Sequence, residues 1–424
     1  MKEIINNIVM NIDVDEYDYK FFVFVQNFFC YKHDLDKTSY NELLSNLELN
    51  NEFVELERSE FKIELKEYEL KELVSNYDSY LDKSIREKTG SFYTPKELSL
   101  AMSKRALADY LIVNNVLNKI NCEELIFNNN KQLTKEEEVK VERVIKEIDI
   151  IDISCGTGSF LISVIEVLVE VLKTLSKDFE IRDIVKNIYA ADIQGRALEI
   201  YALIIFDSLL EYGLELSEIP SLNILCTDSL LEEQLFNKKF DLVIGNPPYV
   251  GEKGNKELFS IYREHLPEYY EGKMDLFYFF IYKGLELLKD DGIFTYLTSN
   301  YFVTADGASK LRKYLKERVS FVRLINFDEC KLFKEAKGMH NLIFTLSKKN
   351  IESVKIQYID KSNKEFKKED IYYEKYSTSK EMLFSEDNNI VIYESASYFN
   401  IIDKILSKSD FRRFNLESLD CWHK

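Results

Sequence analysis

Short apolar runs alternate with longer helix-like stretches through the middle of the chain, and this alternation indicates the fold class. Six runs carry the pattern, at residues 148–153, 188–193, 223–226, 240–244, 292–298 and 321–327. Runs of this length, separated by stretches of helical length, are typical of buried strands joined by crossover helices. The middle of the chain is therefore expected to form an open α/β sheet.

The segments that flank these runs follow other patterns. Residues 40–88 place apolar and charged positions at three- and four-residue spacing, which predicts amphipathic helices. Thr94 and Pro95 are suited to the N-cap and first turn of a helix reaching about residue 113. Residues 128–143, rich in Lys and Glu, are expected to form a connector or an exposed helix.

The chain after residue 350 carries a weaker pattern. Its β-like runs at 354–358 and 390–393 predict short strands, and residues 397–407 predict one helix. This region is expected to be a small α+β piece.

Composition narrows the class of protein. With 424 residues, 46% apolar and 31% charged, the chain can bury a large core and is neither disordered nor fibrous. No apolar run approaches the roughly 18 residues of a membrane helix, and acids occupy the first 20 residues where a signal peptide has lysines. A cytoplasmic protein is expected. Six cysteines without a Cys-x-x-Cys pair and four histidines without ligand spacing predict neither disulfides nor a metal centre.

The formal net charge of -18 is unfavourable for a protein that binds nucleic acid, but the charge is uneven. Residues 1–90 hold 11 Lys and Arg against 20 Asp and Glu, whereas residues 250–349 hold 17 against 14. The later stretch includes Arg312, Lys313, Lys316, Arg318, Arg323, Lys331, Lys334 and Lys337. These residues suit either a path for a phosphate backbone or a solvated helix face.

A glycine turn follows the first apolar run. Asp152 ends that run, and Ser-Cys-Gly-Thr-Gly-Ser-Phe at residues 154–160 leads into the helix-like stretch 161–173. A strand, a tight turn and a helix N-terminus in series direct backbone N–H groups at a ligand. Leu161 stands where a dinucleotide fingerprint has its third glycine, which disfavours a pyrophosphate cofactor.

Two acids follow the next two strands in order. Asp192 ends the second run, where a carboxylate can accept both hydroxyls of a ribose. Asp228 follows the third run, where it can accept an amino proton from an adenine. Each acid alone suits a helix cap equally well, but their order at successive strand ends favours one ligand site.

The fourth run leads into Asn246, Pro247, Pro248 and Tyr249. The prolines fix the backbone, so the Asn246 amide oxygen and the Pro247 carbonyl form a preset pair of acceptors. Such a pair can hold both protons of an exocyclic amino group and aim its lone pair at an incoming methyl group. Tyr249 can stack on the extracted base.

In this order, the segment 90–95 (Gly-Ser-Phe-Tyr-Thr-Pro), the glycine turn, the two acids and Asn-Pro-Pro-Tyr resemble the motifs of adenine-N6 DNA methyltransferases. The resemblance is to the gamma arrangement of the restriction-modification enzymes that use S-adenosylmethionine, and it covers about residues 88–348. It implies a Rossmann-like, mostly parallel seven-stranded methyltransferase sheet with flanking helices. The implied divisions are an N-terminal helical region (1–88), a methyltransferase domain (89–349) and a C-terminal extension (350–424).

The resemblance also implies roles for residues of this sequence. Catalysis falls to Asn246, Pro247, Pro248 and Tyr249, and the flipped adenine stacks on Tyr249 and Phe333. Asp275-Leu276-Phe277 resembles a motif that packs against the cofactor. The implied S-adenosylmethionine site comprises Thr94, Pro95, Asp152, Ser154, Cys155, Gly156, Gly158, Phe160, Asp192, Ile193, Asp228, Ser229 and Asn246.

The expected partner is double-stranded DNA with a flipped adenine. Relatives carry a large target-recognition domain after the catalytic domain, whereas about 75 residues follow here. Either the polypeptide is truncated or split, or another subunit supplies recognition.

Two other functions remain open at this stage. Asn-Pro-Pro-Tyr also serves N-methyltransferases that act on a protein glutamine or on RNA, and a non-catalytic, cofactor-binding subunit of a restriction complex would carry the same turn. Cytosine-C5 methylation is excluded, because no proline precedes a cysteine.

Overall fold

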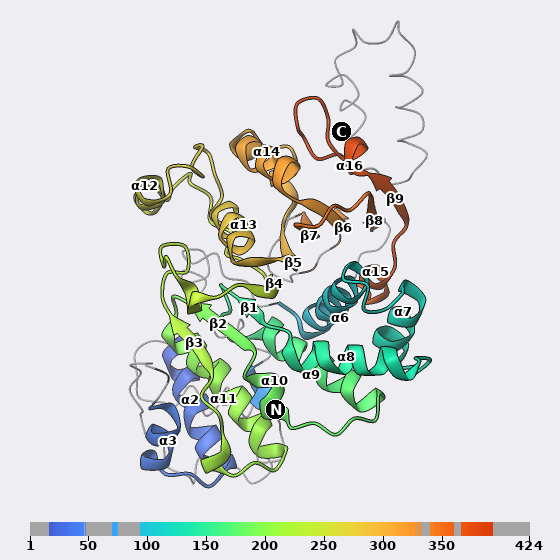
Figure 1. The fold of residues 1–424 in the computed structure, drawn as a ribbon. Coiled ribbons are helices and arrows are strands. Elements are labelled where there is room, and N and C mark those ends of the chain that lie inside the picture. The colour runs from blue at the N-terminus through green and yellow to red at the C-terminus, as the bar shows by residue number, and fades with distance from the viewer. Residues whose placement is uncertain are drawn as a thin grey trace, which may run out of the picture.

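A nine-stranded sheet forms the centre of the computed structural model, which describes residues 17–45, 47, 70–74, 94–328, 330, 332, 340–359 and 366–392 (Figure 1). The strands follow the order β3-β2-β1-β4-β5-β7-β6-β8-β9. Their bounds are β1 Ile150–Asp152, β2 Ile188–Asp192, β3 Asn223–Cys226, β4 Phe240–Gly245, β5 Leu288–Ser299, β6 Ser320–Asp328, β7 Asn341–Ser347, β8 Ser353–Tyr358 and β9 Tyr376–Ser379. The prediction of a mostly parallel α/β sheet with flanking helices is confirmed.

The strand count differs from the predicted seven. Strands β1 to β5 are parallel to one another, and β7 runs antiparallel between β5 and β6. Beyond β6, β8 is parallel to β6 and β9 is antiparallel to β8. The run at 354–358 thus became β8, whereas Ile390 forms only an isolated bridge with Phe384. The helix predicted at 397–407 lies outside the described residues.

Helices cover both faces of the sheet, because each face presents a continuous apolar surface. One face packs against α6 Lys96–Val113, α9 Ser159–Thr174 and α11 Gly195–Glu211, with α7 Lys119–Asn128, α8 Lys135–Glu147 and α10 Ile181–Val185 outside them. The other face packs against α13 Leu276–Leu287 and α14 Ser309–Arg318, and α12 Lys256–His265 lies outside α13 (Figure 1). Short helices complete the chain: η4 Leu216–Glu218, η5 Leu235–Asn237, η6 Asn300–Val303, η7 Asp306–Ala308, α15 Glu369–Tyr372 and α16 Lys380–Leu383.

Two predicted helices differ in detail. Helix α6 begins at Lys96 with Pro95 at the N-cap and no side-chain cap, so Thr94 lies just before the cap. The segment 128–143 contributes to α8, which starts with a capping box between Thr134 and Glu137 and buries an apolar face.

The N-terminal helices α2 Tyr17–Lys32, α3 Lys37–Leu44 and α4 Leu70–Val74 pack on α11. Asp207 of α11 pairs with Lys32 at 2.8 Å and accepts from the Leu70 N–H at 3.1 Å. Glu199 accepts from Gln26 of α2 at 2.8 Å. Buried acids on one side of α11 thus attach this region to the helix layer that covers the sheet.

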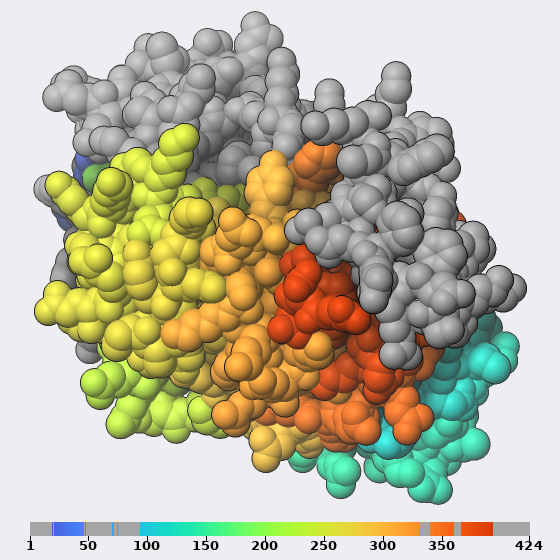
Figure 2. Space-filling model, turned by 90° about the horizontal axis from the view of Figure 1, so that it is seen from above, coloured from blue at the N-terminus to red at the C-terminus, as the bar shows by residue number. Residues whose placement is uncertain are grey.

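The basic stretch after residue 310 is partly internal. Arg312 donates to the carbonyls of Phe302 and Ala305, and Arg323 forms a buried ion pair with Asp109. These two arginines cannot contact a phosphate backbone. Figure 2 shows residues 376–392, in red, against the orange α14 region, where Arg312 also donates to Asn388 at 3.2 Å. No helix in the described part of the chain has the length and apolarity to cross a bilayer.

Candidate active site

The predicted site residues gather along one edge of the sheet. Strands β1 to β4 are parallel, so their carboxyl ends meet at the same edge. Asp152 ends β1, Asp192 ends β2, Asp228 follows β3 and Asn246 follows β4. Open α/β sheets bind ligands at this edge. The four positions that sequence order suggested are therefore neighbours in space.

The glycine turn and Asp192 form one hydrogen-bonded unit. Oδ2 of Asp192 accepts from the Gly156 N–H and Oδ1 accepts from the Gln194 N–H, both at 2.8 Å. Gly158 has φ 86°, and a Cβ there would lie 2.1 Å from the Tyr201 ring. Only glycine fits that position without displacing the ring. The turn therefore holds the carboxylate with backbone N–H groups, and no cationic side chain of the described residues pairs with it.

Asp152 lies at the centre of the edge, next to the loop of residues 246–249 after β4, which we call the reaction loop. Its Oδ1 accepts from the Ser154 N–H at 2.9 Å, and burial, with a smaller contribution from the charge of Asp192, raises the pKa of Asp152 to about 7. A Cβ on Gly245 would lie 2.7 Å from that same oxygen. Gly245 therefore leaves the space that the carboxylate occupies, a requirement visible only in three dimensions.

Asp152, Asp192 and Asp228 form a row of acids along this edge of the sheet. Asp228 and Ser229 lie at the β3 end of that row. Oδ1 of Asp228 accepts from the Leu230 N–H at 3.0 Å, and Oδ2 accepts from the Tyr262 hydroxyl at 3.0 Å. The hydroxyl oxygen of Ser229 is buried and has no hydrogen-bond partner among the residues that the structure describes. A buried polar atom without a partner is costly, which suits a position that a ligand completes.

Asn246 is fixed from two sides. Its Nδ2 donates to Oγ1 of the buried Thr94 at 3.2 Å, and its Oδ1 accepts from the Tyr249 hydroxyl at 2.6 Å. The ring of Tyr249 packs edge-on against Phe277, with centroids 5.9 Å apart. Thr94, expected as a helix cap, thus contacts the reaction loop directly.

Asp275 supports the reaction loop at its C-terminal end, where Val250 follows Tyr249. It is the N-cap of α13, and its Oδ1 accepts from the Val250 N–H at 3.2 Å. Burial raises the pKa of Asp275 to about 6. The predicted Asp275-Leu276-Phe277 motif therefore supports the loop through both Asp275 and the contact of Phe277 with Tyr249.

The remaining predicted residues fall into three groups. Cys155 and Phe160 have buried side chains in the apolar core, whereas Ile193 is 67% exposed beside Asp192. Phe333 and residues 90–93 lie outside the described residues. Sequence reasoning missed Gly245 and Tyr262, and no local pattern marks either residue.

These residues fit S-adenosylmethionine. The carboxylates of this edge accept from N–H and hydroxyl donors, Gly156 has open space on its side-chain face, and the Ser229 hydroxyl has no partner among the described residues. Acids without a cationic partner suit a ligand with hydroxyl, amino and cationic groups. Among the described residues, no group of three or more His, Cys, Asp or Glu side chains could hold a metal ion.

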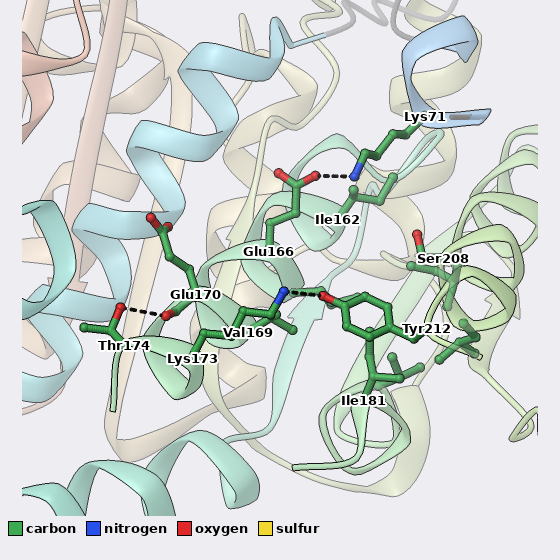
Figure 3. Close-up of a pocket in the computed structure, with 14 residues that line it drawn as sticks. Lys71, Ile162, Glu166, Val169, Glu170, Lys173, Thr174, Ile181, Ser208 and Tyr212 are labelled. Atoms are coloured by element: carbon green, nitrogen blue, oxygen red, sulfur yellow. Dashed lines mark hydrogen bonds and ion pairs between the residues drawn. The ribbon is translucent and has the colours of Figure 1, made fainter. Parts of the chain in front are cut away.

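A separate cavity of about 520 Å³ lies in the outer helix layer, between α9, α10 and α11 (Figure 3). Its lining is mainly apolar, with Lys71 paired to Glu166 at 3.0 Å and Lys173 donating to the Tyr212 hydroxyl at 3.2 Å. None of the predicted site residues lines it. The cavity therefore belongs to the helix packing and not to the edge site.

The sheet order and the edge site are similar to those of S-adenosylmethionine-dependent methyltransferases with a Rossmann-like fold. Residues 186–333 match the family model described as the Eco57I restriction-modification methylase. The predicted resemblance, fold class and cofactor are confirmed in these terms.

Relatives of known name agree with this family match. The chain is 27% identical over 267 residues to the type II restriction enzyme and methyltransferase RM.Eco57I of Escherichia coli, covering 52% of this chain and 27% of that protein. It is 32% identical over 187 residues to the type II methyltransferase M.HincII of Haemophilus influenzae, covering 41% of this chain and 36% of that protein. The matched part thus spans about a quarter to a third of these relatives' length.

Solved structures share the fold. The type IIL restriction-modification enzyme MmeI, in complex with DNA, superimposes with a TM-score of 0.55 and 15% identity, covering 85% of this chain and 58% of that chain. A nuclease-deletion mutant of the type ISP enzyme LlaGI, with a DNA substrate mimic, gives a TM-score of 0.53 and 17% identity, covering 90% and 40%. At these identities, the likeness is one of fold.

Proposed function

We propose that this chain methylates the N6 amino group of adenine in double-stranded DNA, within a restriction-modification or phage-defence system. The observation that carries the proposal is the Asn246 amide, held between Thr94 and Tyr249 at the end of β4, beside Asp152 and Asp192. The named relatives and the DNA-bound neighbours support DNA as the substrate.

The reaction loop addresses the chief difficulty of the chemistry. The lone pair of an exocyclic amino nitrogen is delocalised into the ring, so this nitrogen is a poor nucleophile. Asn246 Oδ1 and the Pro247 carbonyl accept the two amino protons and favour a tetrahedral nitrogen whose lone pair points toward the row of acids. The acceptors stabilise charge that develops in the transition state, so no strong base is needed.

The cofactor residues would divide along the row. Asp192 would accept the ribose hydroxyls, Asp228 and Ser229 would contact the adenine, and Asp152 would lie near the methionine end. Thr94, Pro95 and the glycine turn would complete that end. Bound S-adenosylmethionine supplies an electrophilic methyl group.

Tyr249 would give up its hydrogen bond to Asn246 and stack on the base when the base enters. Its hydroxyl donates to the Asn246 oxygen in this structure, so its ring already lies beside the acceptor. An amino proton can replace that hydroxyl at the oxygen while the ring stacks on the base, a contact that contributes about 1–3 kcal/mol. Phe333 would cover the other face of the base. Sequence recognition would come from a separate subunit or from chain beyond residue 350.

The test is incubation with labelled S-adenosylmethionine and mixed genomic DNA, followed by digestion to nucleosides and a search for N6-methyladenine. Asn246→Ala should abolish transfer while changing cofactor affinity by less than about tenfold, or roughly 1.4 kcal/mol. Asn187→Ala is the matched control, because its amide donates to the Lys146 carbonyl at 2.7 Å, before the start of β2.

The outcomes separate the candidate functions. Equal turnover by Asn246→Ala would reject the mechanism. Label in a protein glutamine or in RNA, with none in DNA, would reject the substrate and keep the chemistry. Cofactor binding without transfer, even at a large excess of protein over DNA, would identify a non-catalytic subunit.

A further inference from the structure

The chain between the reaction loop and α13 forms an arm that leaves the sheet and returns to it. We use this name for residues 251–274. Gly251 and Asp275 form an antiparallel bridge at its base, and the Leu276 N–H donates to the Val250 carbonyl at 2.9 Å. The Glu252 N–H donates to the Met274 carbonyl at 2.9 Å. The arm is therefore anchored directly behind the reaction loop.

Helix α12 brings one side chain of the arm to the far end of the row of acids. Tyr262 of α12 is 5% exposed and packs beside Phe279 of α13, with ring centroids 5.4 Å apart. Its hydroxyl donates to Oδ2 of Asp228 at 3.0 Å, across 34 residues of sequence. The buried ring fixes where the hydroxyl lies, so the donor is held in place before any ligand binds.

The Asp228 carboxylate is consequently restrained at both oxygens. The Leu230 N–H fixes Oδ1 at 3.0 Å and Tyr262 fixes Oδ2. A carboxylate oxygen has two lone pairs, so each oxygen can accept a second donor in a set direction. The neighbouring Ser229 hydroxyl is buried without a partner, which independently indicates that this end of the row is completed by a ligand.

We propose that Tyr262 is a positioning residue that orients Asp228 to recognise the exocyclic amino group of the cofactor's adenine. The inference deepens the proposed function and rests on it. Adenine presents a donor at position 6, whereas hypoxanthine presents an acceptor, so an oriented carboxylate selects the former. Without the hydroxyl, the carboxylate rotates more freely and must be ordered when the ligand binds.

The experiment is isothermal titration with S-adenosylhomocysteine and with S-inosylhomocysteine, its hypoxanthine counterpart. Wild-type protein should prefer the adenine ligand by about tenfold or more, the usual effect of one hydrogen bond to a charged group. Tyr262→Phe keeps the ring and should reduce that preference about three- to tenfold by weakening adenine binding alone. In Asp228→Asn protein, adding Tyr262→Phe should change the preference no further.

Tyr110→Phe is the matched control. Tyr110 is also buried and donates to an aspartate, Asp241, at 3.1 Å, but near the amino end of β4. This variant should keep the full preference, which separates orientation of Asp228 from loss of a buried tyrosine hydroxyl.

The outcomes distinguish the inference from the function on which it rests. Failure of wild-type protein to bind S-adenosylhomocysteine would overturn both. Binding with an undiminished preference in Tyr262→Phe would overturn the role of Tyr262 and leave the proposed function intact. An equal fall in Tyr262→Phe and Tyr110→Phe, or an additive fall in the Asp228→Asn background, would also overturn it.

Discussion

The two edges of the sheet hold their acids in opposite ways. At the amino edge, Asp149 pairs with Lys238 at 2.6 Å and Lys289 at 3.2 Å, and Asp241 pairs with Lys289 at 2.7 Å. At the carboxyl edge, Asp152 and Asp192 accept from backbone N–H groups and a serine hydroxyl, with no cationic partner in the described part of the chain. The first arrangement neutralises charge within the protein, and the second does not.

This difference indicates which acids serve the fold and which serve a ligand. A buried carboxylate without a cation is costly to ionise, and burial raises the pKa values of both Asp152 and Asp192. The acids of the amino edge are paired with lysines, whereas those of the carboxyl edge bear this cost. The difference indicates that the carboxyl edge binds a ligand of complementary charge. Four predictions test the contrast, in order of decreasing effect.

Asp192→Ala should weaken S-adenosylhomocysteine binding at least about a hundredfold, because two hydrogen bonds from ribose hydroxyls to a charged acceptor are lost. Calorimetry gives the affinity, and urea unfolding reports stability. Binding within a few fold of wild type would show that the carboxyl edge holds its acids for another reason.

Asp241→Ala should have the converse effect. It removes the acceptor for Lys289, for the Asp149 N–H and for the Tyr110 hydroxyl, so stability should fall by about 2 kcal/mol or more. Cofactor affinity of the folded protein should be unchanged. A large loss of affinity with no loss of stability would erase the distinction between the edges.

Cofactor affinity should rise with pH about tenfold between pH 6 and pH 8, because a cationic methionine end favours the ionised form of Asp152. The pKa of Asp152 is raised from its ordinary value of 3.8 to about 7. Between pH 3.8 and about 7, Asp152 is protonated in the folded protein and ionised in the unfolded chain. The contribution of Asp152 to the free energy of unfolding therefore falls as the pH rises from 3.8 to about 7. Calorimetry across this pH range measures the slope and the proton release.

Asp152→Asn provides the control for that prediction. The amide does not titrate, so the part of the pH dependence of cofactor affinity that Asp152 causes should vanish. Any part caused by Asp275 or Asp192 should remain. An unchanged pH dependence would assign the titration to another group and separate Asp152 from the ligand.

Cofactor should slow alkylation of Cys226 at least about threefold. Cys226 pairs with Asp192 across β2 and β3, and it is exposed, whereas Cys30, Cys122, Cys155 and Cys330 are buried. Burial raises the pKa of Cys226, so labelling is best followed near pH 8.5 by peptide mass mapping. Equal rates with and without cofactor would place the ligand away from the ends of β2 and β3.

The parts of the structure that sequence predicted are local. The six apolar runs became strands, and the glycine turn, Asp192 and Asn246 lie where strand ends are expected, because each depends on a few adjacent residues. Strand β7 was not among the runs, since Asn341, Thr345 and Ser347 interrupt its apolar positions.

The unpredicted parts depend on contacts between distant segments. Thr94 contacts Asn246 across 152 residues of sequence, and Tyr262 of the arm contacts Asp228 across 34 residues. Arg312 and Arg323 look like surface charges in the sequence, but long-range partners bury them. Such pairings follow from topology, which spacing alone does not encode.

Gly245 lies where two parts of the candidate active site meet, the Asp152 carboxylate and the reaction loop. Its missing side chain leaves the volume that the Asp152 carboxylate fills, one residue before Asn246. A larger side chain at Gly245 would displace the Asp152 carboxylate and would also shift Asn246, the next residue in the chain. A single substitution at this position is therefore expected to affect both the proposed cofactor site and the proposed base site.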